Sequence, residues 1–261
     1  MIRSTIYGPI QSRRLGRSLG INLMPEHVKV CSFDCLYCEC GFLTGEKAAI
    51  PSRFFIVSEL EKQLRLFSEK QETIDSFTFS GNGEATLHPD FEAIIDDTIR
   101  LRDQYFPSSR ITVLSNSTRI FDSSVRRALQ KVDEAVLKLD SAITSTMQLL
   151  DQPNDKSFSS EKIIEGLTMF REQIEKDGHG KLTIQTILLR GSYQEKMVDN
   201  TSAIEQKAWL KAIESIRPHS VMLYALDRPA PIETLEKVSM EEMILWKEKV
   251  SELGINVVVA G

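Results

Sequence analysis

Short apolar segments alternate along the chain with longer segments whose apolar residues recur every three to four positions. The short segments are typical of buried strands and the longer ones of amphipathic helices. The pattern predicts strands over residues 19–24, 76–79, 111–114, 135–139, 182–188, 220–225 and 255–259. It predicts helices over residues 57–70, 91–105, 123–132, 159–174, 203–216 and 240–253. Repeated strand and helix units joined by right-handed crossovers predict an α/β fold with a parallel sheet, either open or curled into a barrel.

Two of the predicted helices carry a sequence typical of a capping box. Ser58 is followed by Glu61, and Ser239 is followed by Glu242. In this motif the hydroxyl and the carboxylate satisfy free backbone N–H groups at the helix start. No low-complexity linker divides the chain, and the polar segment 151–160 is long enough only for a loop. We therefore expect a single domain over residues 1–261.

Polar residues and glycines follow the predicted strands. Open sheets and barrels both place ligand groups on the loops that leave the carboxyl ends of their strands. In chain order these ends carry the cysteine-rich segment, SGNGEATLHP, SNST, KLDS, QTILLRG and YALDRP. These polar residues and glycines should therefore gather on one rim of the sheet, which predicts a binding or catalytic site there.

Composition excludes some classes of protein. With 41% hydrophobic residues the chain has ample material for a core. It holds no apolar run of the roughly 18 residues that a membrane span needs, and its N-terminus lacks the apolar region of a signal peptide. We expect a cytoplasmic protein that makes no contact with membranes. A net charge of -5 gives no overall basic footprint for nucleic acid, although a local basic face stays open.

All four cysteines lie within residues 31–40, CSFDCLYCEC, which we call the cysteine loop. In a reducing compartment, clustered thiols indicate metal binding or redox chemistry more than disulfides. Cys31, Cys35 and Cys38 follow a C-x3-C-x2-C spacing, and three thiolates on a cubane iron–sulfur cluster leave one iron free for another ligand. A zinc site would favour two separated pairs. We expect Cys40 to be a packing residue, with a redox or ligand role as the alternative.

These three cysteines, with Tyr37 directly before the last, resemble the signature of the radical S-adenosylmethionine (SAM) superfamily. The resemblance implies a partial (βα)6-type parallel barrel with the cluster loop after the first strand, and residues 1–18 as an N-terminal extension. It also implies that Cys31, Cys35 and Cys38 hold a [4Fe-4S] cluster and that the amino and carboxyl groups of SAM chelate the fourth iron. Tyr37 is then expected near the adenine.

Residues 79–91, FSGNGEATLHPDF, resemble the glycine and glutamate motif that ends the second strand in this superfamily. Gly81 and Gly83, on either side of Asn82, allow the backbone to approach a ligand closely, and Glu84 supplies an acceptor for a cationic amine. The resemblance implies that this motif binds the amino group of SAM. Ala85 stands where many relatives have proline. The alternative is an ordinary turn that leads into a helix.

Five further residues join the candidate cofactor site. Ser115 and Asn116 resemble the ribose-contacting end of the third strand. Lys138 and Asp140 alternate with leucines, so both project from one face of their strand. We expect them to form a pair that faces the cofactor, with a rim salt bridge as the alternative. Gln185 is expected in the same inward register.

Four segments together are similar to the branch of wyosine-synthase-like iron–sulfur oxidoreductases: SRRLGRSLGIN, the cysteine loop, SGNGEATLHPDF and YALDRP. This similarity implies modification of a tRNA guanosine. However, no cysteine precedes Cys31, where wyosine synthases carry ligands of a second cluster. Arg13, Arg14 and Arg17 are candidates for contacts with phosphates or an anionic substrate, with a solvated basic face as the alternative.

The resemblance implies an enzyme that cleaves SAM reductively and abstracts a hydrogen atom from a substrate by means of a 5′-deoxyadenosyl radical. A flavodoxin or ferredoxin is the expected electron donor, and a tRNA or nucleoside base the expected substrate. An activating enzyme for a glycyl-radical partner protein is the second candidate. The third, a non-catalytic metal-binding module, predicts zinc in place of iron and no cleavage of SAM.

Overall fold

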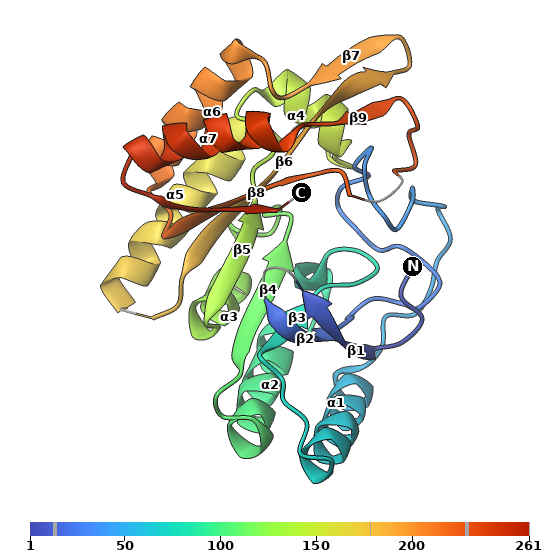
Figure 1. The fold of residues 1–261 in the computed structure, drawn as a ribbon. Helices are drawn as coiled ribbons and strands as arrows, with labels where there is room; N and C mark the ends of the chain where they lie inside the picture. The colour runs from blue at the N-terminus through green and yellow to red at the C-terminus, as the bar shows by residue number, and fades with distance from the viewer. Residues whose placement is uncertain (13–14, 178, 228–229, 261) are drawn as a thin grey trace.

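The computed structural model describes residues 1–12, 15–177, 179–227 and 230–260 (Figure 1). Its centre is a row of parallel strands in the order β2, β3, β4, β5, β6, β8, β10. The row curls into a half-barrel, as expected from the sequence. The strands are β2 (Gly16–Ile21), β3 (Ser76–Phe79), β4 (Arg110–Ser115), β5 (Glu134–Lys138), β6 (Leu182–Tyr193), β8 (Ser220–Ala225) and β10 (Asn256–Ala260).

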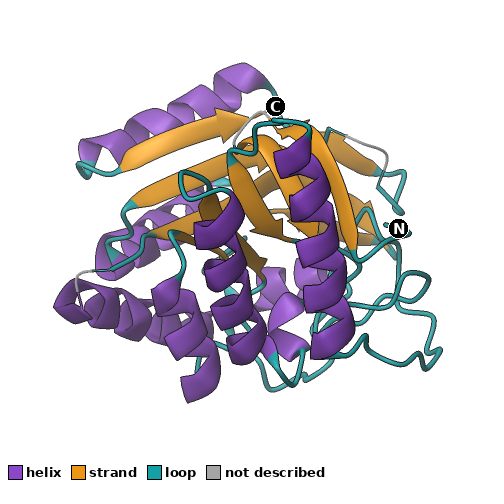
Figure 2. Cartoon of the chain, turned by 90° about the horizontal axis from the view of Figure 1, so that it is seen from below, coloured by secondary structure: helices purple, strands orange, loops and turns teal. Residues whose placement is uncertain are grey.

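Helices connect these strands and cover the outer side of the half-barrel (Figure 2). This arrangement places all crossovers on one side and leaves the carboxyl ends of the strands at a common rim. The helices are α1 (Arg53–Glu69), α2 (Phe91–Tyr105), α3 (Ser123–Lys131), α4 (Thr144–Asp151), α5 (Ser160–Asp177), α6 (Ala203–Ile216) and α7 (Met240–Glu252), with a short 3-10 helix, η1 (Ala85–Leu87). None of the helices in the described residues has the length and apolar character needed to cross a membrane.

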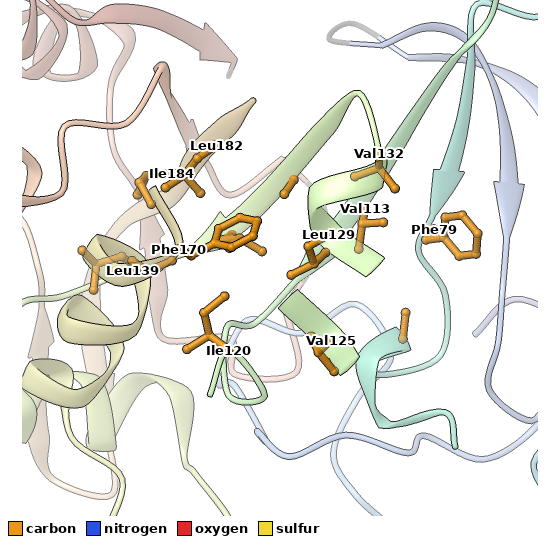
Figure 3. Close-up of a cluster of buried hydrophobic side chains, with 14 of the residues drawn as sticks. Phe79, Val113, Ile120, Val125, Leu129, Val132, Leu139, Phe170, Leu182 and Ile184 are labelled. Carbon is orange, nitrogen blue, oxygen red and sulfur yellow. The ribbon is translucent and has the colours of Figure 1, made fainter. Parts of the chain in front are cut away.

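Apolar side chains of the sheet and of the helices form the main core between them. Figure 3 shows part of this layer, where Val113 of β4, Leu129 of α3 and Phe170 of α5 gather. All three are fully buried. Truncating such a residue to alanine costs about 2 to 5 kcal/mol of stability, so the core fixes the strands whose ends carry the candidate site.

Antiparallel strands extend the sheet at two places. β1 (Ile6–Ser12) pairs with β2 at the edge of the half-barrel. Residues 1–18, the expected N-terminal extension, thus include β1 and the first residues of β2. β6 continues past the rim, where β7 (Lys196–Asp199) and β9 (Leu235–Lys237) pair with it.

The predicted strands agree with the structure to within a few residues, but one predicted helix start is wrong. Helix α1 begins at Arg53, and the side chain of Ser52 accepts a hydrogen bond from the N–H of Phe55. Ser58 therefore lies inside the helix and forms no capping box with Glu61. The second capping box is confirmed, because Ser239 and Glu242 exchange both bonds at the start of α7.

Candidate active site

The cysteine loop is anchored to the end of β3 by main-chain contacts. Val30 and Gly83 form an isolated parallel bridge, in which the N–H of Val30 donates to Asn82 O at 3.0 Å and that of Glu84 donates to Val30 O at 2.9 Å. Gly83 has φ +145°, and a Cβ there would lie 1.8 Å from Val30 O. Only glycine permits this approach. The bridge thus holds the residue before Cys31 against the glycine motif.

The same loop caps the carboxyl end of α4. The last carbonyl groups of a helix lack partners within it. Here Leu150 O accepts from the N–H of Leu36 at 3.0 Å, and Asp151 O accepts from the N–H of Asp34 at 3.0 Å. The cysteine loop therefore lies between the glycine motif on one side and α4 on the other.

A buried ion pair closes the loop on itself. Lys29 Nζ donates to Asp34 Oδ1 at 2.9 Å and to Gly41 O at 2.8 Å, and its side chain is 2% exposed. Asp34 Oδ1 also accepts from the N–H of Leu43 at 2.9 Å. The contacts join the entry, the middle and the exit of the loop, and so hold the cysteines in a defined arrangement.

Each of the three spaced cysteines has a different polar neighbour. Asn116 Nδ2 lies 3.5 Å from Cys31 Sγ, and Lys138 Nζ lies 3.0 Å from Cys35 Sγ. Cys38 is hydrogen-bonded to Cys40, whose thiol also donates to Gly81 O at 3.5 Å. The fourth cysteine is thus half-buried against the glycine motif and in direct contact with the third.

The surroundings shift the pKa values of the four thiols in different directions. Burial, and then the negative charge of Glu84, raise the pKa of Cys31 to about 11. Burial also raises the pKa of Cys35 well above its usual value. The hydrogen bond with Cys40 lowers the pKa of Cys38 to about 5 and raises that of Cys40. A coordinated metal deprotonates such thiols outright, so all of them remain competent ligands.

Glu84 is a buried carboxylate, 2% exposed, that receives three hydrogen bonds. Its Oε1 accepts from the N–H and the hydroxyl of Thr86, and its Oε2 accepts from the N–H of Asn116 at 2.7 Å. In the described part of the chain no Lys, Arg or His forms an ion pair with it. An ionised carboxylate offers about four lone-pair sites, so one further donor can be accommodated.

Asn82, predicted as a cofactor contact, is fully buried and ties together segments far apart in the sequence. Its Nδ2 donates to the carbonyl oxygens of Ile2, Pro25 and Glu26, and its Oδ1 accepts from the N–H of Ile2. Gly81 serves close packing as well, because a Cβ there would lie 2.2 Å from Asn22 Oδ1.

The end of β4 reaches the first cysteine. The side chain of Asn116 contacts Cys31 and donates to Ser32 Oγ at 2.9 Å. The hydroxyl of Ser115 accepts from the N–H of Ser117 at 3.2 Å, which stabilises the turn after the strand. The structure thus brings Asn116 to the cysteine loop, whereas Ser115 shapes the rim beside it.

Lys138 and Asp140 form the predicted pair, at 3.2 Å, and a second carboxylate joins them. Asp151 Oδ1 lies 2.6 Å from Lys138 Nζ, and both carboxylates are buried. The hydroxyl of Tyr37 donates to Asp140, and its ring centroid lies 4.8 Å from the ammonium group. Burial by itself lowers the pKa of Lys138, but the two aspartates outweigh it and raise this pKa well above its usual value.

Gln185 projects into a cavity of about 120 Å³ inside the half-barrel, as the expected inward register requires. Tyr7 of β1, which sequence analysis did not select, lines the same cavity. Its ring packs on Gly20, where a Cβ would lie 2.0 Å from it, and its hydroxyl lies 2.6 Å from Ser80 Oγ. β1 thus forms one wall of the cavity below the rim.

Arg17, one of the three arginines expected near a substrate, is not part of this rim. The guanidinium of Arg17 pairs with Glu72, and its main-chain N–H donates to Asp75 at 2.7 Å, at the opposite end of the sheet. Arg13 and Arg14 lie outside the described residues, as does Arg228 in YALDRP.

In the part of the chain that the structure describes, no three His, Cys, Asp or Glu side chains form a group suited to one metal ion. A cubane cluster distributes its thiolates over separate irons, so they do not need to meet at one point. The donor set fits such a cluster, because Cys31, Cys35 and Cys38 are thiols on one anchored loop.

Comparison with known proteins decides the family. The model of the Radical SAM superfamily matches residues 26–201, from before the cysteine loop to the end of β7 and the following turn. The chain belongs to the radical SAM superfamily. It is a radical SAM enzyme, and the cofactors of this family are a [4Fe-4S] cluster and SAM.

Two relatives show how the similarity extends along the chain. UPF0026 protein MJ1312 of Methanocaldococcus jannaschii is 31% identical, over 95% of this chain and 74% of that protein. A GTPase Obg of Brachyspira hyodysenteriae is 29% identical over 91% of this chain. The match covers only 32% of the length of that relative.

A crystal structure of a radical SAM methyltransferase from Sphaerobacter thermophilus has the same fold, with a TM-score of 0.68 over 93% of this chain and 65% of that one. At 13% identity, this likeness concerns the fold alone.

Proposed function

We propose that this radical SAM enzyme abstracts a hydrogen atom from a tRNA or nucleoside base. When bound, the cluster and SAM supply the chemistry: one electron breaks the C5′–S bond of the sulfonium, which yields methionine and a 5′-deoxyadenosyl radical. The hydrogen atom taken from the substrate completes 5′-deoxyadenosine. The protein contributes binding, orientation and exclusion of water.

In this proposal Cys31, Cys35 and Cys38 would each ligate one iron of the cluster, which would leave one iron free for SAM. The observation that carries the assignment is the buried carboxylate of Glu84, which no described cation neutralises. A buried charge is costly unless it is paired. Because Asn116 links Glu84 to the first cysteine, a cation bound there lies next to the cluster loop. The ammonium group of SAM meets this requirement.

The other residues of the cofactor site mainly hold the glycine motif and the cysteine loop in the positions that the cofactors require. Gly81 and Gly83 let the glycine motif approach its neighbours closely, and the hydrogen bonds of Asn82 hold that motif in place. Ser115 shapes the rim at the ribose. Lys138 and Asp140 fix the cysteine loop, and Asp140 orients Tyr37 toward the adenine.

The substrate assignment rests on two observations. The first is the similarity of four sequence segments to wyosine-synthase-like enzymes, which act on tRNA. The second concerns Gln185, which the sequence placed at the cofactor site: its side chain lines the cavity inside the half-barrel, where its Nε2 lies 3.7 Å from Met222 Sδ. A planar donor and acceptor pair suits the hydrogen-bonding edge of a base. A cytoplasmic flavodoxin or ferredoxin is the proposed electron donor.

The test is anaerobic reconstitution with iron and sulfide, followed by addition of SAM and dithionite, with and without tRNA. We expect the wild-type protein to release 5′-deoxyadenosine and methionine in equal amounts, at a higher rate with tRNA. Cys35→Ser should release neither. Binding of zinc without iron would overturn the proposal. Cleavage that responds to a partner protein and not to RNA would favour the activating-enzyme alternative.

A further inference from the structure

One ammonium group and one carboxylate bear directly on the second cysteine. Lys138 Nζ donates to Cys35 Sγ at 3.0 Å and to Asp151 Oδ1 at 2.6 Å, which brings this carboxylate close to the same sulfur. Cys35 and Asp151 are buried, and the side chain of Lys138 is 12% exposed. Charges in such a dry environment interact far more strongly than in water.

The position of the ammonium group is well defined. Lys138 Nζ lies 5.2 Å from the ring centroid of Phe33 and 4.8 Å from that of Tyr37, both on the cysteine loop. Asp151 Oδ1 holds it from the other side at 2.6 Å. Lys138 therefore cannot leave the sulfur without breaking several contacts at once.

The two aspartates beside Lys138 are not equivalent. Asp140 accepts hydrogen bonds from the hydroxyl of Tyr37 and from the N–H of Ile187, which partly neutralise its charge. The side chain of Asp151 accepts a hydrogen bond from Lys138, and its negative charge acts on the Cys35 thiol. Asp151 is thus the carboxylate whose charge acts most directly on the cysteine sulfur.

We propose that Lys138 and Asp151 are positioning residues that shift the reduction potential of the cluster in opposite directions through Cys35. The inference rests on the proposed function, in which Cys35 is a cluster ligand. Reduction adds one negative charge to the cluster and its thiolates. A hydrogen-bonding cation at a ligand sulfur stabilises this charge, and a carboxylate opposes it.

The experiment is an anaerobic redox titration of the reconstituted cluster, followed by the EPR signal of its reduced state. We expect Lys138→Met to lower the equilibrium constant for reduction at least tenfold, which is about 59 mV toward negative potential. Asp151→Asn should shift the midpoint by a similar amount toward positive potential. Lys162→Met, which removes an exposed charge on α5, should leave it unchanged.

Opposite signs distinguish this role from a structural one, since damage to the loop has no reason to move the two variants in opposite directions. If Lys138→Met does not fold, two other results test the inference. One is the sign of the shift in midpoint potential for Asp151→Asn. The other is the return of that midpoint toward the wild-type value when Lys138→Met is added to Asp151→Asn. Equal midpoints, or shifts of one sign, would overturn the inference. Assembly of an intact cluster by Cys35→Ser would instead overturn the ligand assignment on which it rests.

Discussion

The main-chain N–H of Asn116 donates to Oε2 of Glu84 at 2.7 Å. This bond joins the carboxyl ends of β3 and β4, and the side chain of Asn116 continues the connection to Cys31. Two strand ends and the cysteine loop thus share one buried carboxylate. The charge of Glu84 therefore acts at the centre of the rim, although the residue follows the end of the cysteine loop by 44 positions.

Replacing Glu84 with Gln should weaken SAM binding while the cluster still assembles. The substitution keeps the size of the side chain but removes the charge that, in the proposed function, faces the ammonium group of SAM. A hydrogen bond to a charged group contributes about 1.5 to 3 kcal/mol, so we expect the affinity for SAM to fall at least tenfold. Binding to the reconstituted protein, measured by equilibrium dialysis, checks this.

The matched control is Asp90→Asn, which removes an exposed carboxylate six residues farther along the same loop. It should bind SAM as the wild-type protein does. An unchanged affinity in Glu84→Gln with full iron content would contradict the assignment of Glu84.

Substituting Gly83 with alanine should damage both stability and cluster assembly. The new Cβ would lie 1.8 Å from Val30 O at a φ of +145°, so the bridge before Cys31 must open. Overpacking combined with backbone strain costs about 3 kcal/mol or more. Urea unfolding gives the free energy, and iron per chain reports on assembly. Gly45→Ala, in open space at a φ of +76°, should cost only about 1 to 2 kcal/mol and retain iron.

The sequence could predict the rim because each motif that forms it lies within a short continuous segment of the chain. The spacing of Cys31, Cys35 and Cys38 lies within one loop, and strands buried on both faces form short apolar runs that can be recognised individually. Once the strands are parallel, their carboxyl ends must share one edge. Gln185 and Lys138 could therefore be placed by counting residues along a strand.

The contacts that surround the cysteines could not be predicted in this way. Asp151 reaches Cys35 only because α4, a short helix not predicted from the sequence, ends against the cysteine loop. Tyr7 enters the cavity because β1 pairs with β2 over Gly20. Nothing in the sequence around Lys29 indicates that it is buried; its contact with Gly41 O forms only when the cysteine loop folds back over it. Each depends on tertiary packing between segments that share no local pattern.

Asn82 should be a determinant of stability. Asn82→Asp keeps the shape of the side chain but replaces its amide donor with an oxygen that faces the carbonyl groups of Ile2, Pro25 and Glu26. Each buried group left without a partner costs about 1 to 3 kcal/mol, so we expect a total loss of about 3 kcal/mol or more. Chemical denaturation checks the value, with the exposed Asn256→Asp as control. Equal stability of the two variants would contradict this role.

His219 should make the folded protein sensitive to mild acid. Burial, and then the positive charge of Arg171, lower its pKa, and its Nδ1 accepts the N–H of Leu182 at 2.9 Å. Because the unfolded chain protonates this group at a higher pH, near 6.5, the stability it contributes is complete above that pH and is lost as the pH falls below it. His219→Gln, which does not titrate, should therefore lose less in Tm than the wild type between about pH 7.5 and pH 5.5. A curve for His219→Gln that runs parallel to the wild-type curve would refute the prediction.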